Sequence, residues 1–146
     1  MIKFYFIIVI LLLLNNLIVV YAKVRQPFPG NGVLTITKNG GIEDTNEIVQ
    51  VDLHSFQTLI VNRKLLPMDI KAIKDIYNDA IFKILPGHTN FTLQEPQFYE
   101  YLYYVSIPTP LLNYQQKTIL WNSNSKKPSF FYELERIVFE YGVRIV

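Results

Sequence analysis

The chain has 146 residues, 50% of them hydrophobic, and its 14 lysines and arginines against 12 acidic residues leave a formal net charge of +2. That charge is far below the clustered positive field that binding to a phosphate backbone requires, so we expect no nucleic-acid partner. Cysteine is absent, which excludes disulfides, thiolate zinc sites, iron–sulfur clusters and a cysteine nucleophile.

The first segment, residues 1–22, is predominantly apolar, with two adjacent asparagines as its main interruption. A helix of this length crosses roughly 30 Å of hydrocarbon, so we expect an N-terminal transmembrane anchor. A cleaved signal peptide is the alternative, because Lys3 supplies a positively charged start and Ala22 a small residue at the cleavage position. In both cases the chain is delivered to a membrane or held at one. Residues 23–32, rich in proline and glycine, are then a linker to a single domain at 33–146.

The domain is expected to begin with a β-hairpin. Residues 33–37 are β-prone, and Asn39 with the two glycines after it predicts a turn, since these residues tolerate positive φ. Residues 47–53 alternate in part between apolar and polar side chains, as the second arm of the hairpin would. Another short extended run covers residues 56–61.

The clearest helix signal follows Pro67, which suits the first turn of a helix. Asp69 lies favourably near the positive end of the helix dipole, and the Pro-Gly pair at residues 86–87 ends the element. Apolar residues recur there at steps of three and four, the spacing of one buried face: Ile70, Ile73, Ile76, Tyr77, Ala80, Ile81, Ile84 and Leu85. The charged residues of the opposite face are expected to be solvated.

Residues 92–107 are predicted to form a second helix that begins at Glu95-Pro96. Four apolar residues fit a helical stripe: Phe98, Tyr101, Leu102 and Val105. The aromatic and β-branched content of the segment also suits a strand, so the two interpretations compete. Pro108 and Pro110 end the element in either case.

The last elements are an extended run at residues 114–121, a polar loop and a C-terminal helix that Ser129 caps. Its predicted buried stripe consists of Phe130, Phe131, Leu134, Ile137, Val138 and Tyr141. Gly142 ends this helix, and residues 143–146 add a short edge strand. The fold class is therefore α+β, with a small antiparallel sheet and two main amphipathic helices, preceded by the N-terminal transmembrane helix.

Motifs for catalysis or cofactor binding are absent from the sequence: it has no glycine-rich phosphate loop, no paired histidines at metal-ligand spacing and no serine in a nucleophile elbow. His54 and His88 are expected to be surface or loop histidines. The acidic residues Glu43, Asp44 and Glu47 lack the pattern of a calcium loop and are expected to be solvated. We therefore predict a protein that is not an enzyme, with no cofactor, no metal and no small-molecule substrate.

The one compositional oddity is the aromatic load of ten tyrosines and ten phenylalanines. Because Tyr99, Tyr101, Tyr103 and Tyr104 cannot all face inward in any local structure, we interpret them as a candidate protein interface. Stacking on single-stranded nucleic acid would require interleaved basic residues, and the surrounding sequence has none. Asn90 begins a glycosylation triplet that applies only in a secretory lumen, with an ordinary loop as the alternative.

Several features of the chain occur together: an N-terminal apolar segment, a cysteine-free domain, an amphipathic helix ending in Ile-Leu-Pro-Gly at residues 84–87, the aromatic stretch 98–104, and residues 131–142 with Phe-Tyr-Glu-Leu-Glu-Arg. In this layout the chain resembles per os infectivity factor six of baculoviruses and related insect large DNA viruses. The resemblance implies a non-enzymatic envelope protein of the occlusion-derived virion, anchored in virion and host membranes. It also implies a complex with other envelope proteins that serves oral infection of insect midgut cells. The alternative is a small secreted binding protein released after Ala22.

Overall fold

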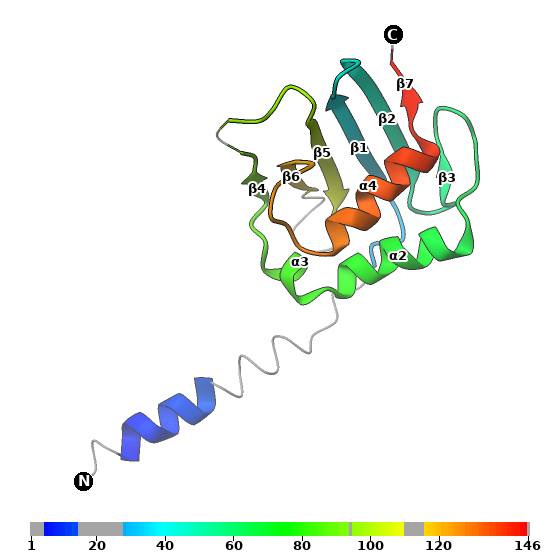
Figure 1. Cartoon of the computed structure of the whole chain (residues 1–146). Coiled ribbons are helices and arrows are strands. Elements are labelled where there is room, and N and C mark those ends of the chain that lie inside the picture. The colour runs from blue at the N-terminus through cyan, green and yellow to red at the C-terminus, as the bar shows by residue number, and fades with distance from the viewer. Residues whose placement is uncertain (1–4, 15–27, 94, 110–115, 146) are drawn as a thin grey trace.

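The computed structural model describes residues 5–14, 28–93, 95–109 and 116–145. Their main feature is a seven-stranded sheet with helices packed on one face, which confirms the α+β class (Figure 1). The elements after residue 28 are β1 (Val33–Gly40), β2 (Thr45–Asp52), β3 (Gln57–Thr58), α2 (Pro67–Asn78), α3 (Ala80–Ile84), β4 (His88–Phe91), β5 (Tyr101–Pro108), β6 (Gln116–Asn122), α4 (Phe130–Tyr141) and β7 (Val143–Arg144). The strand order is β3-β2-β1-β5-β6-β4, and β7 also pairs with β2.

The N-terminal segment is described only in part: residues 5–14 are helical, and the rest of the predicted anchor or signal segment, including Ala22, lies outside the described residues. Among the residues that the structure describes, no helix is both long and apolar enough to cross a membrane. Phe28, inside the predicted linker, packs against the rings of Phe56 and Tyr77, with centroids 5.5 and 5.3 Å away.

The predicted hairpin is confirmed as β1 and β2, which pair from Val33 with Asp52 to Gly40 with Thr45. Gly41, in the turn, has a φ of +76°, and a side chain there would collide with the ring of Tyr101. The turn therefore requires glycine both for its backbone conformation and for the close approach of a neighbouring strand.

The long helix predicted after Pro67 is wrong beyond Asn78, because the chain breaks at Asp79 into α2 and α3. Asp79 has extended backbone angles, and its carboxylate accepts hydrogen bonds from the backbone N–H groups of Ile81 and Phe82. This cap restarts the helix in a different phase. Phe82, which the predicted stripe omitted, is fully buried, whereas the predicted core residues Ile81 and Ile84 are exposed.

The helix predicted for residues 92–107 is also wrong, since most of its aromatic part forms β5. β5 pairs antiparallel with β1 on one side and with β6 on the other, so both rows of its backbone groups are hydrogen-bonded. Tyr103, Val105 and Ile107 are buried, and the residues between them are half-buried on the opposite face. The alternation of period two thus prevails over the helical stripe.

The C-terminal predictions hold for the strand β6, the helix α4 and the edge strand β7. All six apolar residues of the predicted α4 stripe are buried, and Gly142 ends the helix. Ser129 precedes α4, but its side chain makes no capping hydrogen bond, because its backbone is already helical. The sheet is mixed rather than purely antiparallel, because β4 pairs parallel with β6.

The core lies between the sheet and the helices and is largely aromatic. Trp121 of β6 stacks on Tyr103 with ring centroids 5.3 Å apart and contacts Phe131 of α4 at 4.5 Å. Phe82 of α3 meets Phe130 of α4 edge to face at 5.9 Å. The helices therefore cover one face of the sheet, and no helix of the described chain covers the other (Figure 1).

Candidate interaction surface

The four tyrosines expected at an interface are divided between the two faces of the sheet and a loop. Tyr103 is buried beneath α4, where burial and the charge of Glu135 raise its pKa. The neighbouring Trp121 donates its indole N–H to Glu135 over 2.8 Å. Tyr103 therefore belongs to the core rather than to a surface.

Tyr101 lies on the same face as Tyr103 but at the end of the strand, where it is half-buried. The ammonium of Lys38 is 4.2 Å from the centroid of the Tyr101 ring and 3.2 Å from the carboxylate of Glu47. The Tyr101 ring also lies against Gly41, where a side chain would collide with it. Tyr101 thus closes the end of the core against the β1–β2 turn.

Tyr104 points to the face without helices, which we call the open face. The registers of four neighbouring strand pairs place one row across it, with polar and apolar members: Ile48, Thr37, Tyr104, Leu120 and Asn90. The next row is entirely polar: Gln50, Thr35, Ser106, Thr118 and His88. An antiparallel sheet with one solvated face normally carries polar side chains there, so a row containing Ile48, Tyr104 and Leu120 is a surface suited to contact.

Tyr99 lies next to Phe98 in the loop before β5. Its ring meets that of Phe98 edge to face at 5.5 Å, and the two side chains are 48% and 80% exposed. A hollow of about 580 Å³ lies next to this pair and is lined by residues of the loop, of the β1–β2 turn and of the open face, among them Leu93 and Leu102. Phe98 and the open face therefore border the same concave surface, and Tyr99 adjoins it through its contact with Phe98.

The loop that carries the aromatic pair is held in place by polar side chains. Asn122 accepts a hydrogen bond from the backbone N–H of Leu93 over 2.7 Å. The buried carboxylate of Glu100 accepts from the backbone N–H of Gln97 and from the amide of Asn124, over 3.1 and 2.8 Å. Residues 97–100, fixed in this way, present Phe98 and Tyr99 without a large ordering cost on binding.

The two histidines occupy separate places. His88 is exposed in β4 rather than in a loop, and its Nδ1 lies 2.7 Å from the hydroxyl of Thr118 on the open face. His54 follows β2, and its backbone N–H donates to Asp52 over 2.9 Å, which lowers the pKa of that carboxyl group. The two imidazoles thus lie in different parts of the fold, one in the turn after β2 and one in β4.

Of the three acidic residues near the first turn, Glu43 and Glu47 are paired with cations, and Asp44 is exposed. Glu47 binds Lys38, and Glu43 lies 3.3 Å from Arg144 of β7. Within the described ranges, no three histidine or acidic side chains come together as metal ligands. Asn90, in the edge strand β4, is exposed, and its amide oxygen accepts from the N–H and hydroxyl of Thr92.

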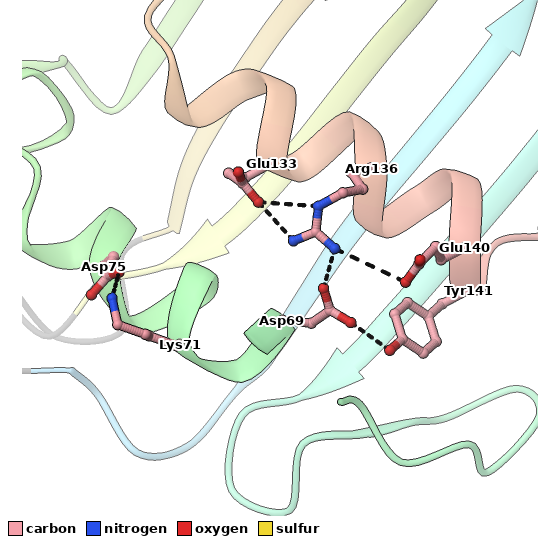
Figure 2. Close-up of polar contacts among 7 residues, drawn as sticks. All are labelled: Asp69, Lys71, Asp75, Glu133, Arg136, Glu140 and Tyr141. Atoms are coloured by element: carbon pink, nitrogen blue, oxygen red, sulfur yellow. Dashed lines mark hydrogen bonds and ion pairs between the residues drawn. The ribbon is translucent and has the colours of Figure 1, made fainter. Parts of the chain in front are cut away.

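An ionic cluster between α2 and α4, built around the buried carboxylate of Asp69, was not anticipated from the sequence (Figure 2). Asp69 is fully buried and bonded to Arg136, and it also accepts a hydrogen bond from the hydroxyl of Tyr141 over 2.6 Å. Arg136 binds Glu133 at 2.7 Å and lies 4.0 Å from Glu140. Its pKa is raised by the hydrogen bonds to Glu133 and Asp69.

This cluster joins two helices that are far apart in the sequence. The Tyr141 hydroxyl also accepts from the backbone N–H of Leu66, just before α2, over 3.0 Å, and both burial and Asp69 raise its pKa. The adjacent hollow of about 410 Å³ is edged by the exposed ion pair of Lys71 with Asp75. Because the Asp69 carboxylate is engaged by both Arg136 and Tyr141, we interpret the cluster as a brace between the helices.

Part of this cluster was visible in the sequence as a pattern. Glu133, Arg136 and Glu140 follow each other at steps of three and four, so they share one face of a helix. Nothing in that spacing indicates Asp69, whose place near the start of α2 indicated only a favourable dipole position.

Comparison of the chain with models of known protein families, with characterised proteins and with solved structures found no match.

Proposed function

We propose that the chain is a non-enzymatic interaction domain that its N-terminal apolar segment holds at a membrane, where it binds other envelope proteins. The observation that carries this proposal is the open face, whose row through Tyr104 and Leu120 leads to the exposed pair Phe98 and Tyr99. Aromatic side chains of this kind contribute large contact areas at a low entropic cost, as anchors of protein interfaces do.

The setting of this complex follows from the resemblance described above. If the chain acts like per os infectivity factor six, its partners are envelope proteins of the occlusion-derived virion, and the complex serves oral infection of insect midgut cells. The apolar N-terminal segment supports this assignment, because a membrane protein of an envelope requires an anchor.

The binding chemistry of the open face favours a partner that presents apolar side chains among hydrogen-bonding groups. Around Tyr104 and Leu120, the face offers the hydroxyls and amides of the polar row next to them. Glycosylation at Asn90 would place a bulky glycan on the same face, so we expect this residue to be unmodified in a chain that is bound to partners.

The test is capture of envelope proteins by the full chain in membranes after crosslinking. Replacing Tyr104 with alanine is expected to reduce the captured partners at least about tenfold, which corresponds to the loss of one well-buried aromatic anchor. Tyr132→Ala is the matched control, since Tyr132 is an exposed tyrosine on α4, away from the open face. Unchanged capture by a folded Tyr104→Ala protein would rule out the open face as the interface.

The N-terminus of the mature protein separates the anchored form from the secreted alternative. A retained N-terminal segment, together with resistance to carbonate extraction, is expected for an anchored envelope protein. A soluble protein that begins at Lys23 would instead support the secreted binding protein released after Ala22.

A further inference from the structure

The strongest unexplained surface outside the open face is the segment of residues 56–66, which we call the apolar hairpin. It contains β3 and leads directly into α2 (Figure 1). At its tip, Leu59, Ile60 and Val61 are consecutive, and their side chains are 47%, 51% and 58% exposed. Leu66, at the end of the segment, is half exposed as well. A soluble surface seldom presents three consecutive apolar residues at a turn.

The apolar hairpin is rigid, so its tip is not a loose loop. Two hydrogen bonds between Thr58 and Arg63 close the turn. The backbone N–H of Thr58 donates to the carbonyl of Arg63 over 2.8 Å, and the backbone N–H of Arg63 donates to the hydroxyl of Thr58 over 2.9 Å. The backbone of Leu59 donates to Gln50 of β2, and Asn62 takes a positive φ of 52° in the turn. The fold thus holds the apolar tip in a fixed position beside β2, at the edge of the sheet, with its side chains exposed.

The charge of the apolar hairpin is entirely positive. It carries Arg63 and Lys64 and no acidic residue. Arg63 is held by the carbonyl of Glu140 at 3.0 Å and lies over the ring of Tyr141 at 4.5 Å, while Lys64 is exposed. An apolar tip with basic residues behind it matches a bilayer surface, where apolar groups enter the interface and cations meet anionic headgroups.

The chain enters the domain at Phe28, beside the base of the hairpin, and the length of the preceding segment limits how far the predicted anchor can be from it. Phe28 stacks on Phe56, at the base of the hairpin, and the carbonyl of Phe56 accepts from the N–H of Leu65 on the opposite arm. From Ala22 to Phe28 the chain spans at most about 21 Å, and Ile60 lies within about 14 Å of Phe56, at roughly 3.5 Å per residue. A domain tethered in this way can reach the bilayer with its hairpin.

We propose that the apolar hairpin is a second membrane contact, whose tip at Leu59, Ile60 and Val61 enters the interfacial layer of an anionic bilayer with Lys64 at the headgroups. This inference rests on the proposed membrane tether. Beyond the tether, it defines how the domain is oriented on the bilayer, because contact through the hairpin fixes which side of the domain faces the lipid.

The absence of cysteine makes the experiment direct, since single cysteines can be labelled with an environment-sensitive dye. The full chain carrying Ile60→Cys is incorporated into vesicles of about 70% phosphatidylcholine and about 30% phosphatidylserine, a composition that attracts basic segments. Ile42→Cys is the matched control, because Ile42 is an exposed isoleucine in the β1–β2 turn. We expect a blue shift and quenching by lipid-borne nitroxides for the label at position 60 alone.

The charge contribution is tested by Lys64→Ser in the Ile60→Cys background and by vesicles of phosphatidylcholine alone. Both changes are expected to weaken the quenching of the label, since each removes part of the attraction between the cation and the anionic lipid. Val61→Cys serves as a second labelling position if the label at Ile60 disturbs the turn.

The outcomes separate this inference from the tether on which it rests. Protein that fails to float with the vesicles would overturn the proposed membrane tether. Protein that floats while the labels at 60 and 42 report the same aqueous surroundings would overturn the hairpin contact and leave the tether intact. Shielding of the label at 60 only after envelope proteins are added would also overturn it, because the tip would then bind protein.

Discussion

The two faces of the sheet are made by the same strands but serve different purposes. Along β6, Ile119 is buried under the helices, whereas Leu120, its neighbour, lies half-buried on the open face. The covered face gathers the aromatic core around Trp121, and the open face mixes a few apolar side chains with hydroxyls and amides. The helices, rather than the strands, decide which half of the alternation becomes core.

Lys117 shows what a charged group requires on the covered face. On the covered side, the ammonium of Lys117 is buried and donates to the carbonyls of Phe82 and Lys83 at the end of α3, and burial lowers its pKa. A charge is tolerated there because the carbonyls at a helix C-terminus complement it. Polar groups on the open face do not require a hydrogen-bond partner within the protein, since water or a binding partner can satisfy them.

The largest expected effect comes from placing a charge on each face in turn. Ile119→Asp should prevent folding, because an unpaired buried carboxylate costs several kcal/mol against a total stability of about 5–15 kcal/mol. Leu120→Asp should keep the fold and cost about 1 kcal/mol, as for surface positions. Far-UV circular dichroism and urea unfolding measure both, and comparable losses in the two variants would contradict the assignment of the faces.

A smaller effect is expected from breaking the brace that holds the covering helices together. Arg136→Met leaves the buried carboxylate of Asp69 without its cation and should cost about 3 kcal/mol. Glu133→Gln removes only a more exposed partner of Arg136 and should cost less than about 1 kcal/mol. Urea unfolding followed by the fluorescence of Trp121, the one tryptophan, measures the difference. Equal losses would mean that the buried pair adds nothing beyond the exposed one.

The smallest expected effect is a dependence of stability on alkaline pH that originates on the covered face. Burial raises the pKa of Tyr77, Tyr103 and Tyr141 above the ordinary value of 10.0. The unfolded chain then loses these protons first, so stability is fully present below about pH 10 and falls as the pH rises further. Tyr103→Phe should flatten this decline and leave stability near pH 8 almost unchanged. An equally steep decline in the variant would show that Tyr103 is not protected by the helices.

Local patterns were sufficient where one periodicity and one set of turn residues agreed. The β1–β2 hairpin followed from a β-prone run and the glycines of its turn, and α4 followed from an unbroken stripe that ends at Gly142. In both, neighbours along the chain supply most of the information, because they share the turn or the helix face. The sequence therefore determined the fold class and these two elements.

Other parts were ambiguous or invisible in the sequence because distant segments decide them. The aromatic stretch around Tyr101–Pro108 fits both periods, and pairing with β1 and β6 made it a strand. The short strand β4 was missed, since its four residues are held by a parallel neighbour that is distant in the sequence. The cap by Asp79 split a stripe that periodicity alone had continued.

The candidate interaction surface also combines features that the local sequence predicts with features that distant segments decide. The sequence by itself determined that the run from Tyr99 to Tyr104 exceeds what one buried face can hold, because alternation or helical spacing always leaves some of these side chains outside. Only the tertiary structure decided that Tyr103 stacks on Trp121 and that Tyr104 lies on the open face. It also decided the burial of Asp69 against Arg136. The physical reason is that local spacing fixes relative directions along one element, whereas burial depends on which other element packs there.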